Sequence, residues 1–376
     1  MRFAPAIAAC VVLLVSGPAF ADDPLAGVGE LIATGRAAEA RTLLASAREA
    51  FVAQGDRPSQ AVTDLLSGLA ETALGDSTAA RASLERAAST FTAAGEHFGA
   101  WLSLTTLAQF ERLNGRPREA IALHERALPL LKAAADPESR FSPRTIEVLG
   151  LVFGGPPEQT RALAGAPELI RTLMLPLAAA VSRIAYGQAL LEIGELEKAE
   201  EQLTQAAAKG TILAGVLDGL LATPMGDLRR RQWRFDEARQ YYETVLNPSV
   251  MPVPAMFMRQ TSADIDLLAK LAEIDVLTGR VDEGLTWNDR ELALARYSEP
   301  AREPWILIER GSLLQKAGRD NDGEKAYREA MAIGEKLRDV RSIGAAQSEL
   351  GCFITTPETT GRRRRTSRKR SRFFRS

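Results

Sequence analysis

The stretch from Gly115 to Leu128 reads GRPREAIALHERAL, and it decides the fold. A turn glycine is followed five positions later by Ala120, then by His124 and, three residues further on, by Ala127. Ala120 and Ala127 are seven residues apart, which places them on one face of a helix. The same template begins again at Gly35, Gly75, Gly194, Trp233, Gly279 and Gly318. We therefore expect a repeated helix that carries one large side chain between two small ones.

A further small residue precedes the turn by seven positions in six of the repeats. Glycine inside a helix costs about 1 kcal/mol relative to alanine, so helix propensity does not explain its recurrence. It predicts instead a close approach of two helices. We predict that these small residues pack the two helices of each repeat together, and that a leucine at Ala120 would overpack the contact. The predicted packing residues are Gly68, Ala80, Ala87, Ala108, Ala120, Ala127, Gly187, Ala199, Ala206, Gly226, Ala238, Gly311, Gly323 and Ala330.

This arrangement resembles the tetratricopeptide repeat (TPR) family. The resemblance rests on the small residues, turns and alanines of residues 61–131, 180–207 and 304–331. The period is 39–40 residues instead of the usual 34, and the Trp, Leu and Tyr positions of the first helix are only partly kept. The resemblance implies an all-α, right-handed solenoid of about seven helix pairs, whose first helices line a concave surface that binds peptides or proteins.

The order of these patterns predicts the domain organisation. Prolines and glycines interrupt residues 136–176, which are either a worn repeat or an insertion. Thr223-Pro224 either lies within a first helix or starts a new one. The predicted segments are a signal peptide (1–21), three repeats (22–135), the irregular segment (136–176), two repeats (177–247), a Pro-rich break (248–258), two repeats with an incomplete one (259–354) and a disordered basic tail (355–376).

The first 21 residues have the pattern of a bacterial secretory signal peptide. Arg2 is followed by an apolar run and by Ala19-Phe20-Ala21, which predicts cleavage after Ala21 and export to the periplasm or beyond. A lipoprotein box around Cys10 is the rival interpretation, although Cys10 lies inside the apolar run. Cleavage would leave Cys352 as the single cysteine, so the fold is expected to be held by packing alone.

The formal net charge of −1 hides an asymmetry. Residues 362–376 contain nine Arg or Lys and no acid, so the rest of the chain carries about −10 (−1 minus 9). An acidic body argues against a nucleic-acid partner. For the basic tail, three interpretations stand: an arm that binds phosphate-rich surfaces or anionic lipid, a processed end, or out-of-frame translation of a longer gene.

The sequence carries no pattern that predicts catalysis. His97 and His124 are the only histidines, and we expect His124 to pack in the core and His97 to lie in a turn between repeats. We do not expect either histidine to pair with Cys352, because several repeats separate them. The chain has no HExxH, CxxC or phosphate-binding glycine loop. We therefore predict a non-enzymatic protein with no cofactor and no metal site.

The remaining function class is binding. We predict a protein-interaction scaffold whose partner is a protein or peptide docked in the concave groove. One alternative is the regulatory repeat half of a longer protein with a C-terminal caspase-like (CHAT-type) protease domain. Another is an envelope accessory protein that touches anionic lipid through its basic tail only. The residues predicted to face the groove are Gln109, Arg112, Gln188, Asp227, Arg230, Lys270, Glu273, Gln315 and Lys316.

Overall fold

The computed structural model describes residues 24–25, 27–146, 148, 167–207, 214–246 and 261–354. Within these residues every regular element is helical, which confirms the predicted all-α fold. The predicted signal peptide, Pro-rich break and basic tail lie outside them. The chain divides into two compact units, which we describe separately: the described residues up to Trp233 form the N-terminal unit, and those from Arg234 onward form the C-terminal unit.

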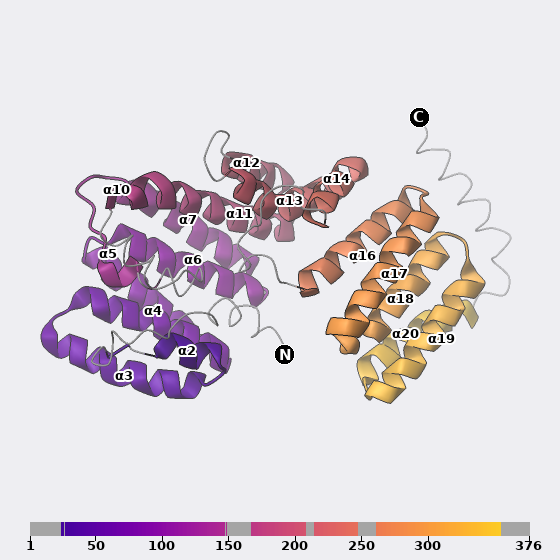
Figure 1. Ribbon diagram of the computed structural model, residues 1–376, viewed down its shortest axis with the longest axis horizontal. Helices are drawn as coiled ribbons and strands as arrows, with labels where there is room; N and C mark the ends of the chain where they lie inside the picture. Colours follow the sequence, from indigo (N-terminus) through magenta and orange to yellow (C-terminus); the bar gives the residue numbers. More distant parts are fainter. Residues whose placement is uncertain are drawn as a thin grey trace. The chain divides into compact units, whose positions relative to one another are not determined.

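The N-terminal unit is a stack of helix pairs (Figure 1). Within it α4 packs on α5, α6 on α7 and α11 on α12, and the second helix of each pair packs on the first helix of the next. First helices also contact one another, α4 with α6 and α6 with α11. Its elements are α2 (Val28–Ala33), α3 (Ala37–Gln54), α4 (Arg57–Leu74), α5 (Ser77–Ala93), α6 (His97–Leu113), α7 (Pro117–Ala134), α10 (Pro167–Leu169), the π-helical η2 (Ile170–Met174), α11 (Leu175–Ile193), α12 (Leu196–Ala206) and α13 (Ala214–Arg231).

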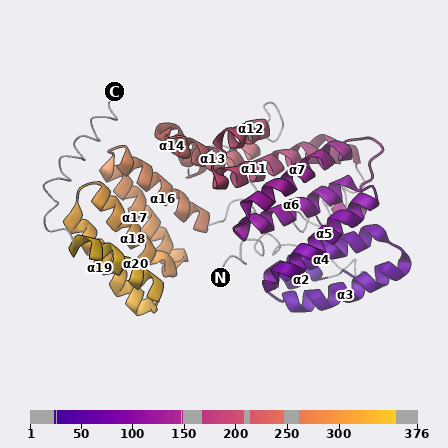
Figure 2. The ribbon, with the colours of Figure 1, turned by 180° about the vertical axis from the view of Figure 1, so that it is seen from behind.

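The C-terminal unit repeats this arrangement, and α16 to α20 lie side by side in both views (Figure 2). Here α16 packs on α17, α18 on α19, and α19 on α20, while the first helices α16, α18 and α20 contact one another in order. In each unit the first helices therefore share one surface. The elements are α14 (Phe235–Leu246), α16 (Thr261–Leu277), α17 (Val281–Ser298), the 3-10 turn η3 (Pro300–Arg302), α18 (Glu303–Lys316), α19 (Asp320–Leu337) and α20 (Val340–Ile354).

The turn between two helices of a pair shows why the sequence repeats a glycine there. Gly75 ends α4 with φ 77°, a left-handed conformation that costs other residues energy. The next N–H, that of Asp76, returns to the carbonyl of Glu71 at 3.0 Å. The Asp76 carboxylate then accepts the N–H of Ala79 at 3.0 Å and caps α5. Two residues thus close one helix and start the next.

The first-helix glycines lie directly under the large residue of the second helix. A Cβ atom added at Gly68 would come 2.5 Å from Leu84 Cγ, and one at Gly187 would come 2.8 Å from Leu203. At Gly311 the neighbour is the Tyr327 ring, also 2.5 Å away. These distances are too short for any side chain larger than hydrogen, so the glycines set how closely the helices of a pair approach.

A second rule governs the contact between consecutive pairs. On the first helix of a pair, the position involved lies three residues after the small residue, as Glu111 follows Ala108. It contacts the second helix of the preceding pair, at the position directly after that helix's first small residue, as Arg81 follows Ala80. We call this the inter-pair position. In three interfaces of the described residues it holds an ion pair with one strongly buried partner: Arg81–Glu111 at 2.7 Å, Glu200–Arg229 at 2.7 Å and Arg239–Asp275 at 3.3 Å.

The polarity of the inter-pair position changes along the chain. The acid lies on the first helix in Glu111 and Asp275, but on the second helix in Glu200. Two further interfaces fill the position with apolar side chains, Ile121 with Leu190 and Leu285 with Leu314, which belong to the same hydrophobic clusters. Because a buried charge requires its partner, each interface accepts only certain neighbours.

Two details of α13 and the turn after it differ from the predicted repeat. Pro224 lies inside α13, so the alternative in which Thr223 caps a new helix is wrong. Trp233 occupies the turn position that glycine holds in the other repeats, and it adopts φ 63° with 73% of its surface exposed. Left-handed backbone is costly for such a residue.

Candidate functional site

Two of the predicted groove residues meet on the first-helix surface of the N-terminal unit. The Arg112 guanidinium donates to Gln109 Oε1 at 3.2 Å on its own helix, α6. It also donates to Glu192 Oε1 at 2.7 Å on the neighbouring first helix, α11. The side chains of Arg112 and Glu192 are 18% and 37% exposed, so solvent reaches the pair. This polar cluster joins two consecutive first helices.

The other predicted groove residues of this unit lie on α11 and α13. Gln188 is half-buried one helical turn before Glu192, on the same face of α11. Asp227 and Arg230 are both half-buried on α13, and being three residues apart they also share a face. The first-helix surface of the N-terminal unit therefore presents amides and both signs of charge.

In the C-terminal unit the predicted groove residues make three different kinds of contact. Lys316 on α18 donates to Glu273 on α16 at 3.2 Å, a bridge between consecutive first helices like that of Arg112 and Glu192. Lys270 lies over the ring of Tyr242, with 5.6 Å between Nζ and the ring centroid. Gln315 instead accepts the hydroxyl of Tyr327 at 2.9 Å, so its carbonyl is engaged within the α18/α19 pair.

His124 lies in the core, where it holds the large position between Ala120 and Ala127. The side chain is 1% exposed, and its ring stacks on Tyr186 with 5.9 Å between centroids. Both ring nitrogens are buried without a hydrogen-bond partner among the described residues. Burial, with a smaller contribution from the Arg112 charge, lowers the pKa of His124 from 6.5 to about 4. The imidazole is therefore neutral at pH 7.

This burial predicts an acid-sensitive N-terminal unit. The pKa of His124 is lower in the folded than in the unfolded state, so the folded state is favoured most above pH 6.5. As the pH falls from 6.5 toward 4, the free energy of unfolding decreases by roughly 3 kcal/mol. The double variant Ala108→Gly with His124→Leu reproduces the Gly68–Leu84 pair of the preceding repeat and has nothing to protonate. Urea unfolding at pH 7 and pH 4.5 should show a smaller loss of stability in the variant, and equal losses would contradict the assignment.

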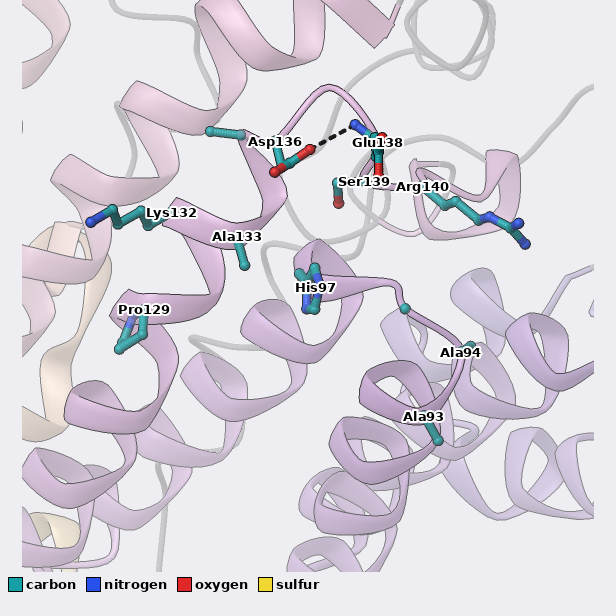
Figure 3. A pocket seen from close by; sticks show the side chains of 12 residues that line it. Ala93, Ala94, His97, Pro129, Lys132, Ala133, Asp136, Glu138, Ser139 and Arg140 are labelled. Carbon is teal, nitrogen blue, oxygen red and sulfur yellow. Dashed lines mark hydrogen bonds between the residues drawn. The ribbon is translucent and has the colours of Figure 1, made fainter.

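A cavity of about 950 Å³ opens where α6 begins and α7 ends. Its walls come from the last residues of α5, the first turn of α6, the last two turns of α7 and the loop that follows (Figure 3). His97, the first residue of α6, lies between the end of α7 and this loop (Figure 3). Two atoms near the cavity, His97 Nδ1 and Ser139 Oγ, are buried without a hydrogen-bond partner in the described structure.

The loop that bounds the cavity is held by contacts from distant residues. Arg171 donates to the carbonyls of Pro137 at 3.0 Å and Ser139 at 3.2 Å, and its guanidinium lies 5.2 Å from the centre of the Phe141 ring. Phe141 in turn meets Phe98 edge to face, with 6.0 Å between ring centroids. These contacts fix the loop against α6, so the cavity wall is part of the fold.

The chemistry of the cavity suits hydrogen bonding to a polar chain. Lys132 and Arg140 offset Asp136 and Glu138, so neither charge sign dominates the lining. An imidazole that both donates and accepts adds to these groups. The prediction that His97 lies in a turn was wrong, since His97 begins α6. The site could not be predicted, because no pattern in the sequence indicates that residues 136–140 return to α6.

The described residues give no support for metal binding, since no group of three His, Cys, Asp or Glu among them could hold an ion. One helical run of 27 residues, Pro167–Ile193, is long and apolar enough to cross a membrane, because it contains an 18-residue window with a mean hydropathy of 1.3. The core helix of a soluble repeat array meets the same criteria, and α11, which makes up most of this run, packs against both α7 and α12.

Comparisons with known proteins give only distant likenesses. No family model and no curated protein matches the chain. Among solved structures, the apo quorum sensor NprR from B. thuringiensis is 13% identical, with 88% of this chain and 98% of that chain covered and a TM-score of 0.33. A Rap protein in complex with competence and sporulation factor is 14% identical (88% and 96% covered, TM-score 0.34), and apo RapI is 12% identical (84% and 86%, TM-score 0.35). At these scores, the assignment of helix pairs rests on the contacts described above.

Proposed function

We propose that this protein is an exported, non-enzymatic scaffold that binds a segment of a partner protein along its first-helix surface. The observation that carries the proposal is the bridge from Arg112 on α6 to Glu192 on α11, two partly exposed groups that join consecutive first helices. A bridge of this kind holds hydrogen-bond donors and acceptors in fixed positions. Because solvent already reaches both side chains, polar groups of a partner can replace water at them with a small desolvation cost.

The same arrangement occurs in the C-terminal unit and supports the proposal. Lys316 and Glu273 join α18 and α16, with side chains 41% and 36% exposed. Other ion pairs of the repeats hold consecutive helix pairs together at the inter-pair position, or lie within one helix, as Arg328–Glu324 does. Each unit therefore carries a bridge between consecutive first helices on its own first-helix surface, where a segment of a partner protein can bind.

Site-specific photo-crosslinking in cells tests this proposal. A photoreactive residue at Gln188 on the first-helix surface is expected to capture a discrete partner, and one at Lys198 on the exposed side of α12 serves as the control, being 65% exposed. A third position, Lys132 at the cavity, tells the two candidate sites apart. Equal capture at Gln188 and Lys198 would show that the first-helix surface is not the binding face, and capture at Lys132 alone would assign binding to the cavity.

The export part of the proposal rests on the charged start, apolar run and small cleavage residues of the first 21 positions. N-terminal sequencing of the protein recovered from the cell envelope or medium is expected to begin at Asp22. A mature protein that begins at Met1 or a lipidated Cys10 would refute this cleavage.

A further inference from the structure

The turn between α19 and α20 carries two apolar side chains that the fold does not bury. Leu337 ends α19 and is 45% exposed, and Val340 begins α20 and is 79% exposed. Trp305 of α18 lies beside this turn, because its Nε1 donates to Asp339 Oδ2 at 3.0 Å, and it is 39% exposed. We call Trp305, Leu337 and Val340 the apolar tip.

The turn between α3 and α4 has the same backbone arrangement as the α19–α20 turn. The residue after the helix is left-handed in both, with φ 66° at Gly55 and φ 56° at Arg338. An aspartate follows in both, and its N–H returns to the last turn of the preceding helix, at 3.0 Å for Asp56 and 2.9 Å for Asp339. Each aspartate then accepts the N–H three residues on, at 3.1 and 3.4 Å, and caps the next helix.

This comparison shows that the turn does not require an apolar tip. Gln54 stands where the α19–α20 turn has Leu337, and it is exposed as well. Arg57 likewise stands where that turn has Val340. Glycine adopts left-handed backbone without steric cost, whereas Arg338 does not. Backbone strain and exposed apolar side chains at one turn, where the chain's own alternative is unstrained and polar, indicate a binding surface.

Three cations surround the apolar tip. Lys336, Arg338 and Arg341 are exposed, and no acid among the described residues pairs with their side chains. The acids of this stretch do not cancel them. Asp339 is held by its indole and backbone donors, and Glu335 lies two residues before the end of α19, which places it on another side of the helix. The tip is therefore ringed by positive charge in a chain whose body is acidic.

We propose that this turn inserts into the headgroup region of an anionic membrane. Indole and aliphatic side chains partition into the interface between water and hydrocarbon, and Lys and Arg beside them bind anionic headgroups. Side chains that protrude from a turn suit a deformable lipid surface, whereas protein partners bury their main contacts in packed pockets. The proposal goes beyond the scaffold function, and it uses a folded turn instead of the basic tail.

A local fluorescence measurement on the full chain tests the insertion. An environment-sensitive fluorescent amino acid replaces Val340, and Lys325 near the other end of α19, also 79% exposed, is the control position. Vesicles of phosphatidylcholine and phosphatidylglycerol in equal parts should shift the emission at position 340 to shorter wavelength and leave position 325 unchanged. Vesicles of phosphatidylcholine alone should shift it much less.

The other outcomes of this measurement would overturn the proposal. No shift at position 340, or equal shifts at both positions, would show that the turn stays in water, as it would if the basic tail alone tethered the chain. An equal shift with phosphatidylcholine alone would refute the role of anionic lipid.

A variant copied from the chain's own sequence separates the apolar tip from its charge. Leu337→Gln, Arg338→Gly and Val340→Arg together reproduce the α3–α4 turn and leave the net charge unchanged, so the variant should fold. Sedimentation with the anionic vesicles should show binding weakened by about tenfold or more. Lys325→Gln is the control and should leave the binding within about twofold. If the triple variant binds as tightly as the wild type, net charge or the basic tail accounts for binding and the proposal is refuted.

A photoreactive amino acid at Val340 tests the other class of occupant, a protein. Capture of a discrete protein in cells, together with no fluorescence shift on vesicles, would assign the turn to a protein partner and overturn the lipid contact. The Gln188 crosslink reads a different surface in the N-terminal unit, so the proposed function and the membrane contact can each fail alone.

Discussion

Arg229→Glu is expected to lower the free energy of unfolding of the N-terminal unit by about 3 kcal/mol. The Arg229 side chain is 11% exposed and donates to Glu200 at 2.7 Å, so the variant would bury one carboxylate beside another. Full burial of both partners would place the cost at about 3–5 kcal/mol, and the 37% exposure of Glu200 keeps it at the lower end.

The double variant Glu200→Arg with Arg229→Glu should recover most of that loss. It restores opposite charges in the polarity that Arg81 and Glu111 already use in another interface of this chain. Gln232, which bridges both partners with its amide, can reverse its orientation and serve either arrangement.

Urea unfolding of the two single variants and the double variant gives the coupling free energy directly. A coupling of about 1–3 kcal/mol is expected. If the double variant is only as stable as the summed free-energy losses of the two single variants predict, the ion pair contributes no specificity to this interface. Arg328→Glu, in an exposed pair within α19, is the control and should cost about 0.5 kcal/mol or less.

Gly68→Ala is expected to destabilise the N-terminal unit by up to about 2 kcal/mol, although alanine is the better helix former. The new Cβ would come 2.5 Å from Leu84 Cγ and 3.3 Å from the carbonyl oxygen of Ala80. Leu84 is fully buried and cannot rotate away without disturbing its neighbours. Overpacking of about 1–3 kcal/mol therefore exceeds the gain of about 1 kcal/mol in helix propensity.

Gly344→Ala is the matched control for that prediction. Gly344 lies inside α20, is exposed, and has no atom within 4 Å of an added Cβ. The same substitution should stabilise here by roughly 0.5–1 kcal/mol. Thermal or urea unfolding of both variants should therefore show changes in stability of opposite sign. Stabilisation by both substitutions would refute the close approach of the helices at Gly68.

The helix pairs could be predicted from the sequence because their contacts repeat at a fixed spacing within a short stretch. The glycine at 68 and the leucine at 84 follow from one template, and the structure places them in contact. The inter-pair position was missed for the opposite reason. Arg81 and Glu111 belong to different repeats, and the change from charged to apolar partners along the chain conceals the rule until the helices are in register.

The candidate binding surface could be predicted only by residue type and helix face. The sequence placed Gln109 and Arg112 on one surface, but not the partner Glu192, which lies 80 residues further along. Gln315 faces Tyr327 because the large residue of its pair is a tyrosine with a hydroxyl to satisfy. The cavity beside His97 depends on a loop closed by Arg171 and Phe141, which no periodic pattern describes.

The inter-pair position has a consequence for how such a gene can change. Similar repeats invite recombination that deletes one whole repeat without shifting the reading frame. Loss of α11 and α12 would bring α7 against α13 and oppose Ile121 to Arg229, a charge that has lost its carboxylate partner Glu200 in an apolar contact. The shortened protein would be expected to fold poorly. Because each interface needs matching side chains, deletion of a single repeat is selected against and the number of repeats is maintained.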